Sequence, residues 1–304
     1  MKTRNLKTIT ILLLCFLSLK TQAQYQAFAG IDNFDSTLTK SQQRIRLGIT
    51  LGAESGVAAA GLTGLYFAWY RGYNTGKFHF FNDIHEWCGM DKFGHAFSTC
   101  YIGSLAYKTA RWSGMNKGNA LVYGTVLPWS FMLGIEILDG FSDGWGFSAF
   151  DVMANTVGSA VFLTQQILWN EQRFSLKYSY FPSPYPKQNP GLLGANFAER
   201  MLKDYNGQTY WLSCNLNSFI KSKRFPNWIN VCVGYSANGM INAENNPNAY
   251  SQFYLSLDVD LTKIPTKSKF LKSLFTVLNC FKAPFLALEV NNNPQGKNVR
   301  AVIR

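Results

Sequence analysis

The sequence predicts an α+β protein: an N-terminal four-helix bundle, embedded in a membrane or packed against one, and then a small antiparallel β-sheet with an amphipathic helix. Three observations support this prediction. Residues 47–170 alternate long apolar segments with short polar ones, which is typical of helices. Beyond residue 170 the apolar residues recur with a period of two, which is typical of strands. Residues 267–282 would place apolar and basic side chains on opposite sides of one helix.

The composition points to a membrane or its surface. The chain has 304 residues, of which 47% are hydrophobic, enough for a sizeable core. Charged residues make up only 15%, against about 25% in ordinary soluble domains. The net charge of +12 is spread along the chain and accompanies no zinc-finger, RNP-type or helix-turn-helix motif. We therefore expect a membrane lipid surface as a partner and no nucleic acid, while protein partners stay unknown.

The first 23 residues have the organisation of an export signal. Three basic residues precede an apolar run at residues 9–19, and Ala23 ends a segment suited to cleavage. Removal of this leader would lower the net charge from +12 to about +8. Two leucines precede Cys15 where a lipobox needs small residues, so we do not expect lipidation there. The sequence thus predicts an exported protein, periplasmic or associated with the envelope.

We expect the chain to be organised in four regions. They are the leader (1–23), a polar segment (24–46), a helical domain (47–170) and a β-rich domain (171–304). The boundary near residue 170 rests on the change of periodicity and on four prolines between residues 182 and 190, which indicate a linker. Five cysteines remain beyond the leader, and this odd number argues against a complete disulfide framework. Cys214 and Cys232 lie in neighbouring predicted strands and either pair or stay free.

The predicted elements follow from these patterns. We expect helices at residues 47–70, 95–112, 119–138 and 148–169, and strands at 174–181, 208–216, 228–235 and 252–261. The uncharged cores of the last three helices are slightly shorter than the roughly 20 apolar residues that span a bilayer. Thin or tilted spans and a buried soluble bundle therefore both stay open. The amphipathic segment 267–282 either covers the sheet or lies on an anionic membrane.

Polar residues recur at helical spacing inside three of the apolar segments, and these are the candidate site residues. The groups are Asp91, Lys92 and His95; Glu136 and Asp139; and Ser148, Asp151, Asn155 and Gly158. Residues three or four apart share one side of a helix, so each group would form one polar face. A buried, unpaired carboxylate is costly, and we expect Glu136 to meet His95 or Lys92 from another helix.

Ordinary structural roles explain part of the pattern. Asp91 has the position of a helix N-cap. Ser148 and Asp151 have the spacing of a capping box that precedes an apolar run. Asn155 is harder to explain by packing, because a buried amide needs several hydrogen-bond partners.

The order of these motifs resembles a known family. Asp-Lys-x-x-His, Glu-x-x-Asp and Gly-aromatic-Ser-x-x-Asp, as they occur from Asp91 to Asp151, are similar to the YfiM-like family of predicted periplasmic lipoproteins. A more distant resemblance links Asp91, Lys92, His95, Glu136, Ser148, Asp151, Asn155 and Gly158 to the VanZ-like membrane proteins, which are associated with glycopeptide resistance. The resemblance covers about a third of the chain, and it implies an envelope protein without a defined biochemical activity.

Two functions are compatible with these residues. In the first, the chain is a membrane-associated binding or structural module, and the polar residues form a network that fixes helix register. In the second, it is a metal-dependent or acid/base hydrolase that acts on a lipid or cell-wall precursor. The catalytic candidates are then His95, Glu136 and Asp151, and the binding candidates are Asp91, Lys92, Asp139, Ser148 and Asn155. In that case Lys92 would hold a phosphate or carboxylate. The sequence identifies neither a cofactor nor a metal.

Overall fold

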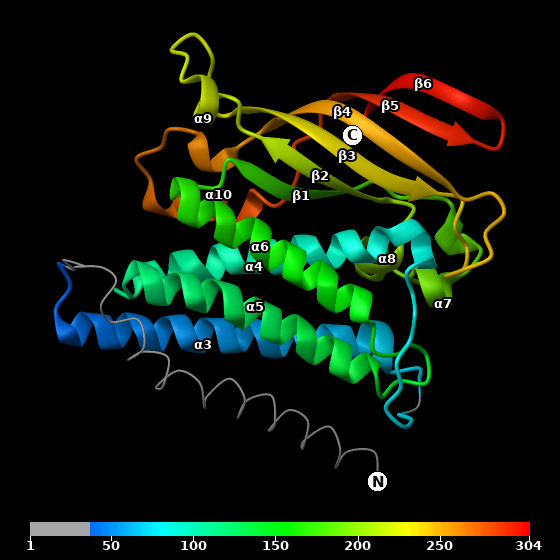
Figure 1. The fold of residues 1–304 in the computed structure, drawn as a ribbon, viewed down its shortest axis with the longest axis horizontal. Coiled ribbons are helices and arrows are strands. Elements are labelled where there is room, and N and C mark those ends of the chain that lie inside the picture. The colour runs from blue at the N-terminus through cyan, green and yellow to red at the C-terminus, as the bar shows by residue number, and fades with distance from the viewer. Residues whose placement is uncertain (1–36, 74) are drawn as a thin grey trace. The chain divides into compact units, whose positions relative to one another are not determined.

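The computed structural model describes residues 37–73 and 75–304 of this chain (Figure 1). The predicted leader and Cys15 lie outside the described residues. The described chain combines α-helices with a six-stranded antiparallel sheet, so the predicted α+β class is confirmed.

Four long helices occupy the segment in which helices were predicted. They are α3 (Lys40–Leu65), α4 (Met90–Trp112), α5 (Lys117–Asp139) and α6 (Ala149–Trp169). Helix α3 begins seven residues before the predicted position 47, because Thr39 and Gln42 form a reciprocal capping box. It continues into the short π-helix η1 (Tyr66–Tyr70). Ser148 caps α6 by accepting a hydrogen bond from the Asp151 backbone N–H, as the sequence predicts.

The expectation of a membrane-embedded helical bundle is not supported. Within the described residues, α5 is the single helix whose length and mean hydropathy suffice to cross a membrane. One such helix is weak evidence, because core helices of soluble proteins meet the same criterion.

The sheet follows the simplest antiparallel order, β1-β2-β3-β4-β5-β6. Its strands are β1 (Phe174–Tyr180), β2 (Gln208–Cys214), β3 (Ile229–Asn238), β4 (Tyr250–Val259), β5 (Leu286–Asn293) and β6 (Gly296–Ile303). The first four lie within a few residues of the predicted positions. The sequence analysis did not predict β5 and β6. Residues 286–290 nevertheless alternate between exposed and buried positions. Gly296, which follows the turn between the two strands, has a positive φ of 118°.

Short helices and turns connect these strands. The segment that was expected to be a proline-rich linker instead forms η3 (Tyr185–Lys187) and the start of α7 (Pro190–Leu193), and α8 (Phe197–Lys203) follows it. Proline fits the first turn of a helix, where its missing N–H costs nothing, and Pro190 is the first residue of α7. The remaining elements are η2 (Glu86–Gly89), α9 (Asn217–Ile220), η4 (Leu261–Lys263) and α10 (Lys269–Leu278).

The two faces of the sheet differ. One is buried and carries many polar residues beside a small cluster that contains Trp211 and Tyr254. The other is mostly apolar, and α4 covers part of it, because Phe93 stacks on Tyr235 there. Strand register places Lys177, Ser213, Asn230 and Asp258 on one face, where each is at most 1% exposed. We call the other side the apolar sheet face. Its exposed members are Leu212, Val233, Phe253, Leu255, Leu257, Leu286, Leu288, Val299 and Ile303. This is the reverse of an ordinary half-solvated sheet, which turns its polar face to water.

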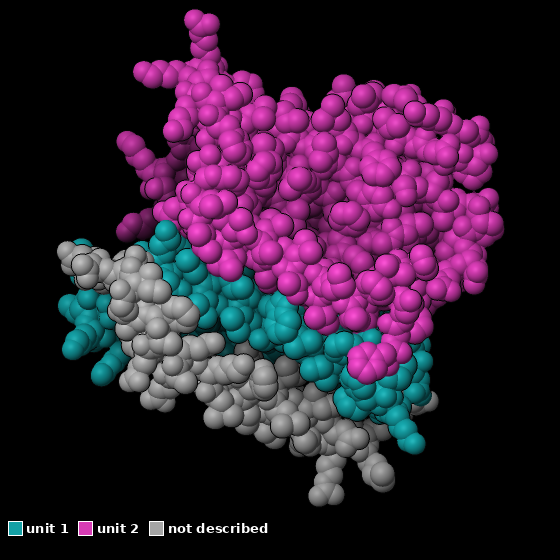
Figure 2. Space-filling view, in the orientation of Figure 1, with its two compact units in different colours: residues 1–79, 102–147 teal, residues 80–101, 148–304 magenta. Residues whose placement is uncertain are grey.

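The chain forms two compact units (Figure 2). Of the described residues, one unit contains 37–73, 75–79 and 102–147, and the other contains 80–101 and 148–304. This division differs from the predicted boundary near residue 170, because the start of α4 and all of α6 belong with the sheet. Phe93 stacks on Tyr235, and Gln165 of α6 hydrogen-bonds the Phe174 backbone at the start of β1.

The five described cysteines are free thiols. Of the two alternatives for Cys214 and Cys232, the structure has the unpaired one. Cys214 lies opposite Val231, and Cys232 lies opposite Ser213. The two side chains therefore point to opposite faces of the sheet, which prevents a disulfide.

Candidate functional site

Seven polar residues from three segments come together in the unit that contains the sheet. Asp83 precedes η2, three residues belong to the first turns of α4, and three belong to the start of α6. We call this group the Lys92 cluster: Asp83, Asp91, Lys92, His95, Ser148, Asp151 and Asn155. Every predicted catalytic or binding residue except Glu136 and Asp139 lies in it.

A strained turn brings Asp83 and the start of α4 together. Trp87, Cys88 and Gly89 have φ values of 49°, 51° and 74°, in the left-handed region that only glycine adopts easily. Each non-glycine residue in such a conformation costs about 1–3 kcal/mol and persists only where its surroundings hold it. The Trp87 N–H donates to the Ala243 carbonyl at 3.0 Å. The Tyr235 hydroxyl donates to the Cys88 carbonyl at 2.7 Å.

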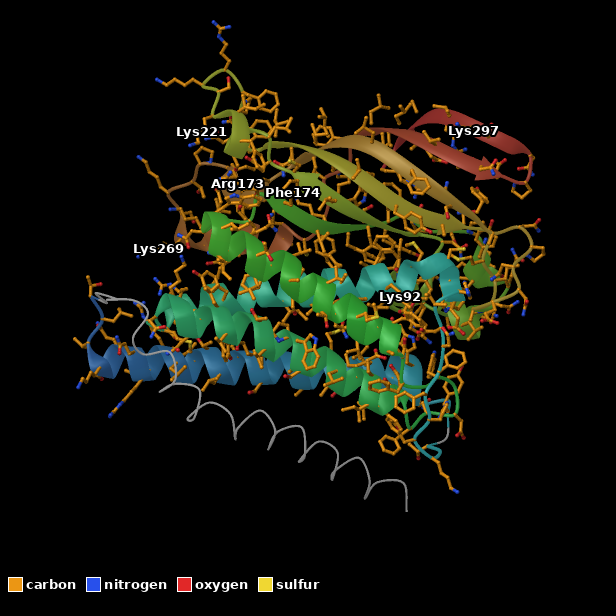
Figure 3. All side chains as sticks on the ribbon, viewed as in Figure 1. Lys92, Arg173, Phe174, Lys221, Lys269 and Lys297 are labelled. Atoms are coloured by element: carbon orange, nitrogen blue, oxygen red, sulfur yellow. The ribbon has the colours of Figure 1, made fainter. Side chains whose placement is uncertain are left out.

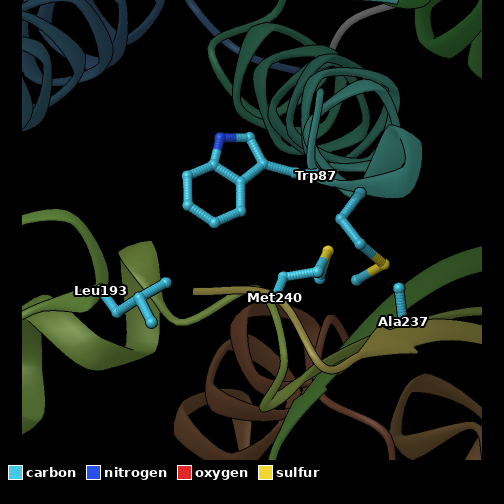
Figure 4. Close-up of a cluster of buried hydrophobic side chains, with 5 residues drawn as sticks. Trp87, Leu193, Ala237 and Met240 are labelled. Atoms are coloured by element: carbon cyan, nitrogen blue, oxygen red, sulfur yellow. The ribbon is translucent and has the colours of Figure 1, made fainter. Parts of the chain in front are cut away.

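A small hydrophobic cluster anchors the same turn (Figure 4). Trp87 and Met90 are buried with Leu193, Ala237 and Met240, which come from α7, the end of β3 and the chain just after it. Full burial of such side chains stabilises a fold by about 1.5–3 kcal/mol each. This packing offsets the backbone strain and fixes the position from which α4 begins.

The ammonium of Lys92 lies at the centre of the cluster. Its Nζ is 2.5 Å from Asp83 Oδ2, 2.9 Å from Asp151 Oδ1 and 3.2 Å from Asp91 Oδ2. Burial alone would lower the pKa of Lys92, but the surrounding carboxylates raise it above its ordinary value. Three carboxylates thus face one ammonium, and the cluster carries an excess of negative charge.

A glycine allows the two helices of the cluster to approach closely. A Cβ at Gly158 on α6 would lie 2.2 Å from the Ala96 carbonyl oxygen on α4. Only glycine fits at such a distance from backbone. Asn155 lies one turn before Gly158 and His95 one residue before Ala96, so this contact places the amide beside the imidazole.

His95 is oriented by that amide. Its Nδ1 lies 3.1 Å from Asn155 Oδ1, and because an amide oxygen only accepts hydrogen bonds, Nδ1 is the donor. The Thr99 hydroxyl also lies 3.0 Å from this oxygen. The other ring nitrogen, Nε2, then faces Asp91 Oδ1 at 3.8 Å and Asp151 Oδ2 at 4.0 Å. Asn155 therefore fixes the orientation of the imidazole ring, with Nε2 directed between two carboxylates.

Two hydroxyl groups complete the contacts of the acidic residues. The Tyr205 hydroxyl donates to Asp91 Oδ1 at 3.0 Å, and the Ser148 hydroxyl donates to Asp83 Oδ1 at 2.6 Å. Burial would raise the pKa of Asp91, but His95, Lys92 and the Tyr205 hydrogen bond hold it below its ordinary value. Asp91 lies inside the first turn of α4 and not at the N-cap position. Its side chain forms an ion pair with Lys92 instead of capping the helix.

Glu86 lies near the cluster and has the opposite shift. It is half-buried, and burial together with the charges of Asp83, Asp91 and Glu244 raises its pKa to about 7. The carboxyl group of Glu86 therefore changes charge near neutral pH, beside an already acidic cluster.

Asp91, His95 and Asp151 lie close enough together for all three to reach one metal ion. One ligand atom from each residue can be chosen so that all three lie within 4.8 Å of one another. Two carboxylates and one imidazole are suitable ligands for Zn²⁺ and Mn²⁺. A metal-bound histidine usually donates its second ring N–H to a neighbouring oxygen, as His95 does to Asn155.

The structure places Glu136 and Asp139 in the other compact unit, at the end of α5. Glu136 is 1% exposed, and Asp139 Oδ1 accepts a hydrogen bond of 2.5 Å from the Tyr70 hydroxyl. The pKa of Tyr70 is raised mainly by burial and, to a smaller extent, by the negative charge of Asp139. The expected pairing of Glu136 with His95 or Lys92 stays a prediction, as do the catalytic and binding roles of all these residues.

Sequence reasoning missed two contributors to the cluster. It selected neither Asp83 nor Tyr205 as a site residue. Asp83 has no helical spacing to Asp91, and Tyr205 lies 114 positions from Asp91 in the chain. Only tertiary contacts reveal these two residues.

Comparison with protein families gives one match. Residues 79–166 match the model of a family described as "Predicted periplasmic lipoprotein (DUF2279)". No curated protein and no solved structure gives a significant match to the chain. The matched segment contains every residue of the Lys92 cluster as well as Glu136 and Asp139. The narrower resemblances to YfiM-like and VanZ-like proteins are not confirmed by this match. It does confirm the predicted localisation: the chain is exported and is periplasmic or associated with the envelope.

Proposed function

We propose that this envelope protein is a binding module whose Lys92 cluster holds a divalent cation between Asp91, His95 and Asp151. The observation that carries the proposal is the placement of one imidazole nitrogen and two carboxylate oxygens within 4.8 Å of one another. Cation ligands bound to one Zn²⁺ or Mn²⁺ lie about 3–4 Å apart, given bonds of about 2.0–2.2 Å. The distances of 3.8 Å and 4.0 Å at His95 Nε2 fit such a site after a small contraction.

The charge of the cluster supports the same proposal. Asp83, Asp91 and Asp151 bring three carboxylates to a single lysine, and the side chain of Asp151 is only 6% exposed. Burial of excess negative charge is costly unless a positive charge compensates it. A divalent cation at Asp91, His95 and Asp151 would remove the imbalance while Lys92 continues to neutralise Asp83.

The position of Lys92 argues against its expected role as a holder of a phosphate or carboxylate ligand. All three of its ion pairs are 3.2 Å or shorter and go to carboxylates of the chain itself. We therefore assign Lys92 to the internal organisation of the cluster.

Metal binding is tested by titrating Zn²⁺ and Mn²⁺ separately into the purified chain after removal of chelator. We expect one equivalent to bind and to raise the melting temperature, because a ligand that binds only the folded state stabilises it. His95→Ala and Asp151→Asn should each lower the affinity at least tenfold. The matched controls are His79→Ala and Asp143→Asn, which change the same residue types outside the cluster.

The alternative result identifies a purely structural network. If neither ion binds the wild-type chain, and His95→Ala lowers the melting temperature in the absence of metal, the cluster holds helices together and the proposal fails. Binding that survives in both cluster variants would also overturn it, since the ions would then be bound elsewhere.

One observation favours hydrolysis as a second candidate function. Asn155 is fully buried, and its Nδ2 has no hydrogen-bond partner among the described residues. Substrate binding would have to expose this amide, which would then donate to an oxygen of a lipid or cell-wall precursor beside His95, the acid or base. Release of phosphate from a polyprenyl diphosphate by the metal-loaded chain, lost in His95→Ala but kept in His79→Ala, would support it. No release above the rate of the His95→Ala variant would exclude this substrate class.

A further inference from the structure

The sheet turns an apolar surface outward over five of its strands. Phe253, Leu255 and Leu257 alternate along β4 and are 57%, 50% and 45% exposed. Leu286 on β5 and Ile303 on β6 lie opposite each other in register, and both are 68% exposed. Contiguous exposed apolar patches of this extent mark contact with a membrane or another protein.

The opposite, buried side of the sheet is held by polar interactions, so the apolar sheet face stays on the outside. Lys177 and Asp258 form an ion pair of 2.7 Å in which both side chains are 0% exposed. Glu289 of β5 accepts a hydrogen bond of 2.8 Å from Gln252 of β4 on this side. An alternation with apolar residues outside and polar residues inside is the pattern of strands that face lipid.

One end of the sheet is strongly basic. The segments that enter and leave the strands there contain Arg173, Lys221, Lys223, Arg224, Lys263, Lys267, Lys269 and Lys272. Figure 3 shows Arg173, Lys221 and Lys269 toward this end, while Lys297 lies at the opposite end. Glu171 pairs with Arg173 and Lys263. The other six form no ion pair with a described residue, and so their charge is available to an anionic partner.

Helix α10 adds an amphipathic surface at the same end. Phe270, Val277 and Leu278 are 73%, 51% and 38% exposed, so the helix leaves much of its apolar side open to a partner. Lys269 and Lys272 accompany this apolar side. Short helices with an apolar side and flanking lysines lie at the boundary between headgroups and acyl chains.

We propose that the apolar sheet face and α10 insert into the acyl region of a bilayer, and that the basic end of the sheet binds its anionic headgroups. The charge complementarity selects this partner, because a soluble apolar partner or a second copy of this basic end would leave the lysines uncompensated. Each lysine or arginine near an anionic surface strengthens binding about fivefold. This inference does not involve the Lys92 cluster. A negative result for membrane binding would therefore leave the metal-binding proposal untouched, and the reverse also holds.

The test is flotation of the purified full-length chain with vesicles. We expect the protein to float with vesicles of phosphatidylethanolamine and phosphatidylglycerol, and much less with phosphatidylcholine alone or at high salt. Phe253→Ser combined with Leu255→Ser should weaken binding about a hundredfold or more, because two exposed apolar side chains no longer enter lipid. The control is Phe197→Ser combined with Leu202→Ser on α8, which removes side chains that are 63% and 50% exposed.

Charge is tested by a second matched pair. Lys221→Gln should weaken binding about fivefold, whereas Lys297→Gln at the opposite end should leave it unchanged. Circular dichroism melting of every variant shows whether the fold is kept. The proposal is overturned if the wild-type chain floats with no vesicle. It is equally overturned if light scattering shows a dimer that Phe253→Ser with Leu255→Ser dissociates while flotation is unaffected.

Discussion

Two of the places where the sheet-containing unit buries charge balance that charge differently. On the polar sheet face, Lys177 and Asp258 form a one-to-one pair, and Lys177 also donates to the Val259 carbonyl at 2.7 Å. Asp258 accepts hydrogen bonds from the Ser213 hydroxyl and the Ala283 N–H. In the Lys92 cluster, three carboxylates share one ammonium, and the side chains of Lys92 and Asp91 are 18% and 23% exposed.

This difference separates a structural pair from a candidate binding site. The Lys177 pair is neutral, sealed and satisfied by the chain itself, so it has nothing to offer a ligand. The Lys92 cluster is negative, reachable by solvent and rich in donor atoms for a metal. Perturbing the two places in parallel therefore distinguishes their roles.

The largest effect is expected at the balanced pair. Lys177→Met leaves the Asp258 carboxylate buried without its cation and should cost about 3–5 kcal/mol in the free energy of unfolding. Urea denaturation measures this loss. The double variant Lys177→Met with Asp258→Leu should recover most of it, and failure to recover would show that other contacts of these side chains dominate.

The corresponding change in the cluster should be smaller and should respond to metal. Lys92→Met leaves three carboxylates near one another, but solvent reaches them, so we expect a loss of about 2–3 kcal/mol. Added Zn²⁺ should restore part of this stability in Lys92→Met and none in Lys177→Met. Equal responses of the two variants to Zn²⁺ would contradict the distinction drawn between the two places.

The contact that assembles the cluster is tested by Gly158→Ala. The added methyl group would lie 2.2 Å from the Ala96 carbonyl oxygen, so α4 and α6 must separate. Overpacking of this kind costs about 1–3 kcal/mol. Because separation also moves Asn155 from His95, metal affinity should fall with stability. Gly191→Ala, where the nearest atom is 3.8 Å away, is the matched control.

The smallest effect concerns pH and Glu86. Its pKa is raised from 4.5 to about 7 in the folded chain, so between these values the folded state binds more protons than the unfolded state. The contribution of Glu86 to the free energy of unfolding is therefore fully present below pH 4.5, and it is lost as the pH rises through 7 and the buried carboxyl group ionises. After allowance for solvent screening of this half-buried group, Glu86→Gln should stabilise the protein by about 1 kcal/mol at pH 8.

The comparison for this change is the same variant at low pH. At pH 4.5 the wild-type Glu86 is protonated in the fold, and the glutamine should be nearly neutral in effect. Thermal melting of both proteins across this pH range measures the difference. A constant difference at all pH values would mean that Glu86 does not titrate near neutrality.

Local sequence signals determined much of the fold. The apolar segments and the capping residue Ser148 located the long helices, and period-two alternation located four of the six strands. Motif spacing identified six of the seven residues of the Lys92 cluster as candidate site residues, because three- and four-residue spacing places side chains on one side of a helix whatever that helix packs against.

Tertiary structure decided what those residues meet. The sequence could not assign the three carboxylates to Lys92, because one of them, Asp83, lies in an irregular segment and reaches it through the left-handed turn at Trp87 and Cys88. Nor could the sequence show which face of the sheet is buried, because apolar and polar residues alternate with a period of two whichever face is turned inward. Long-range packing, which places Phe93 on Tyr235 and seals Lys177 with Asp258, made both decisions.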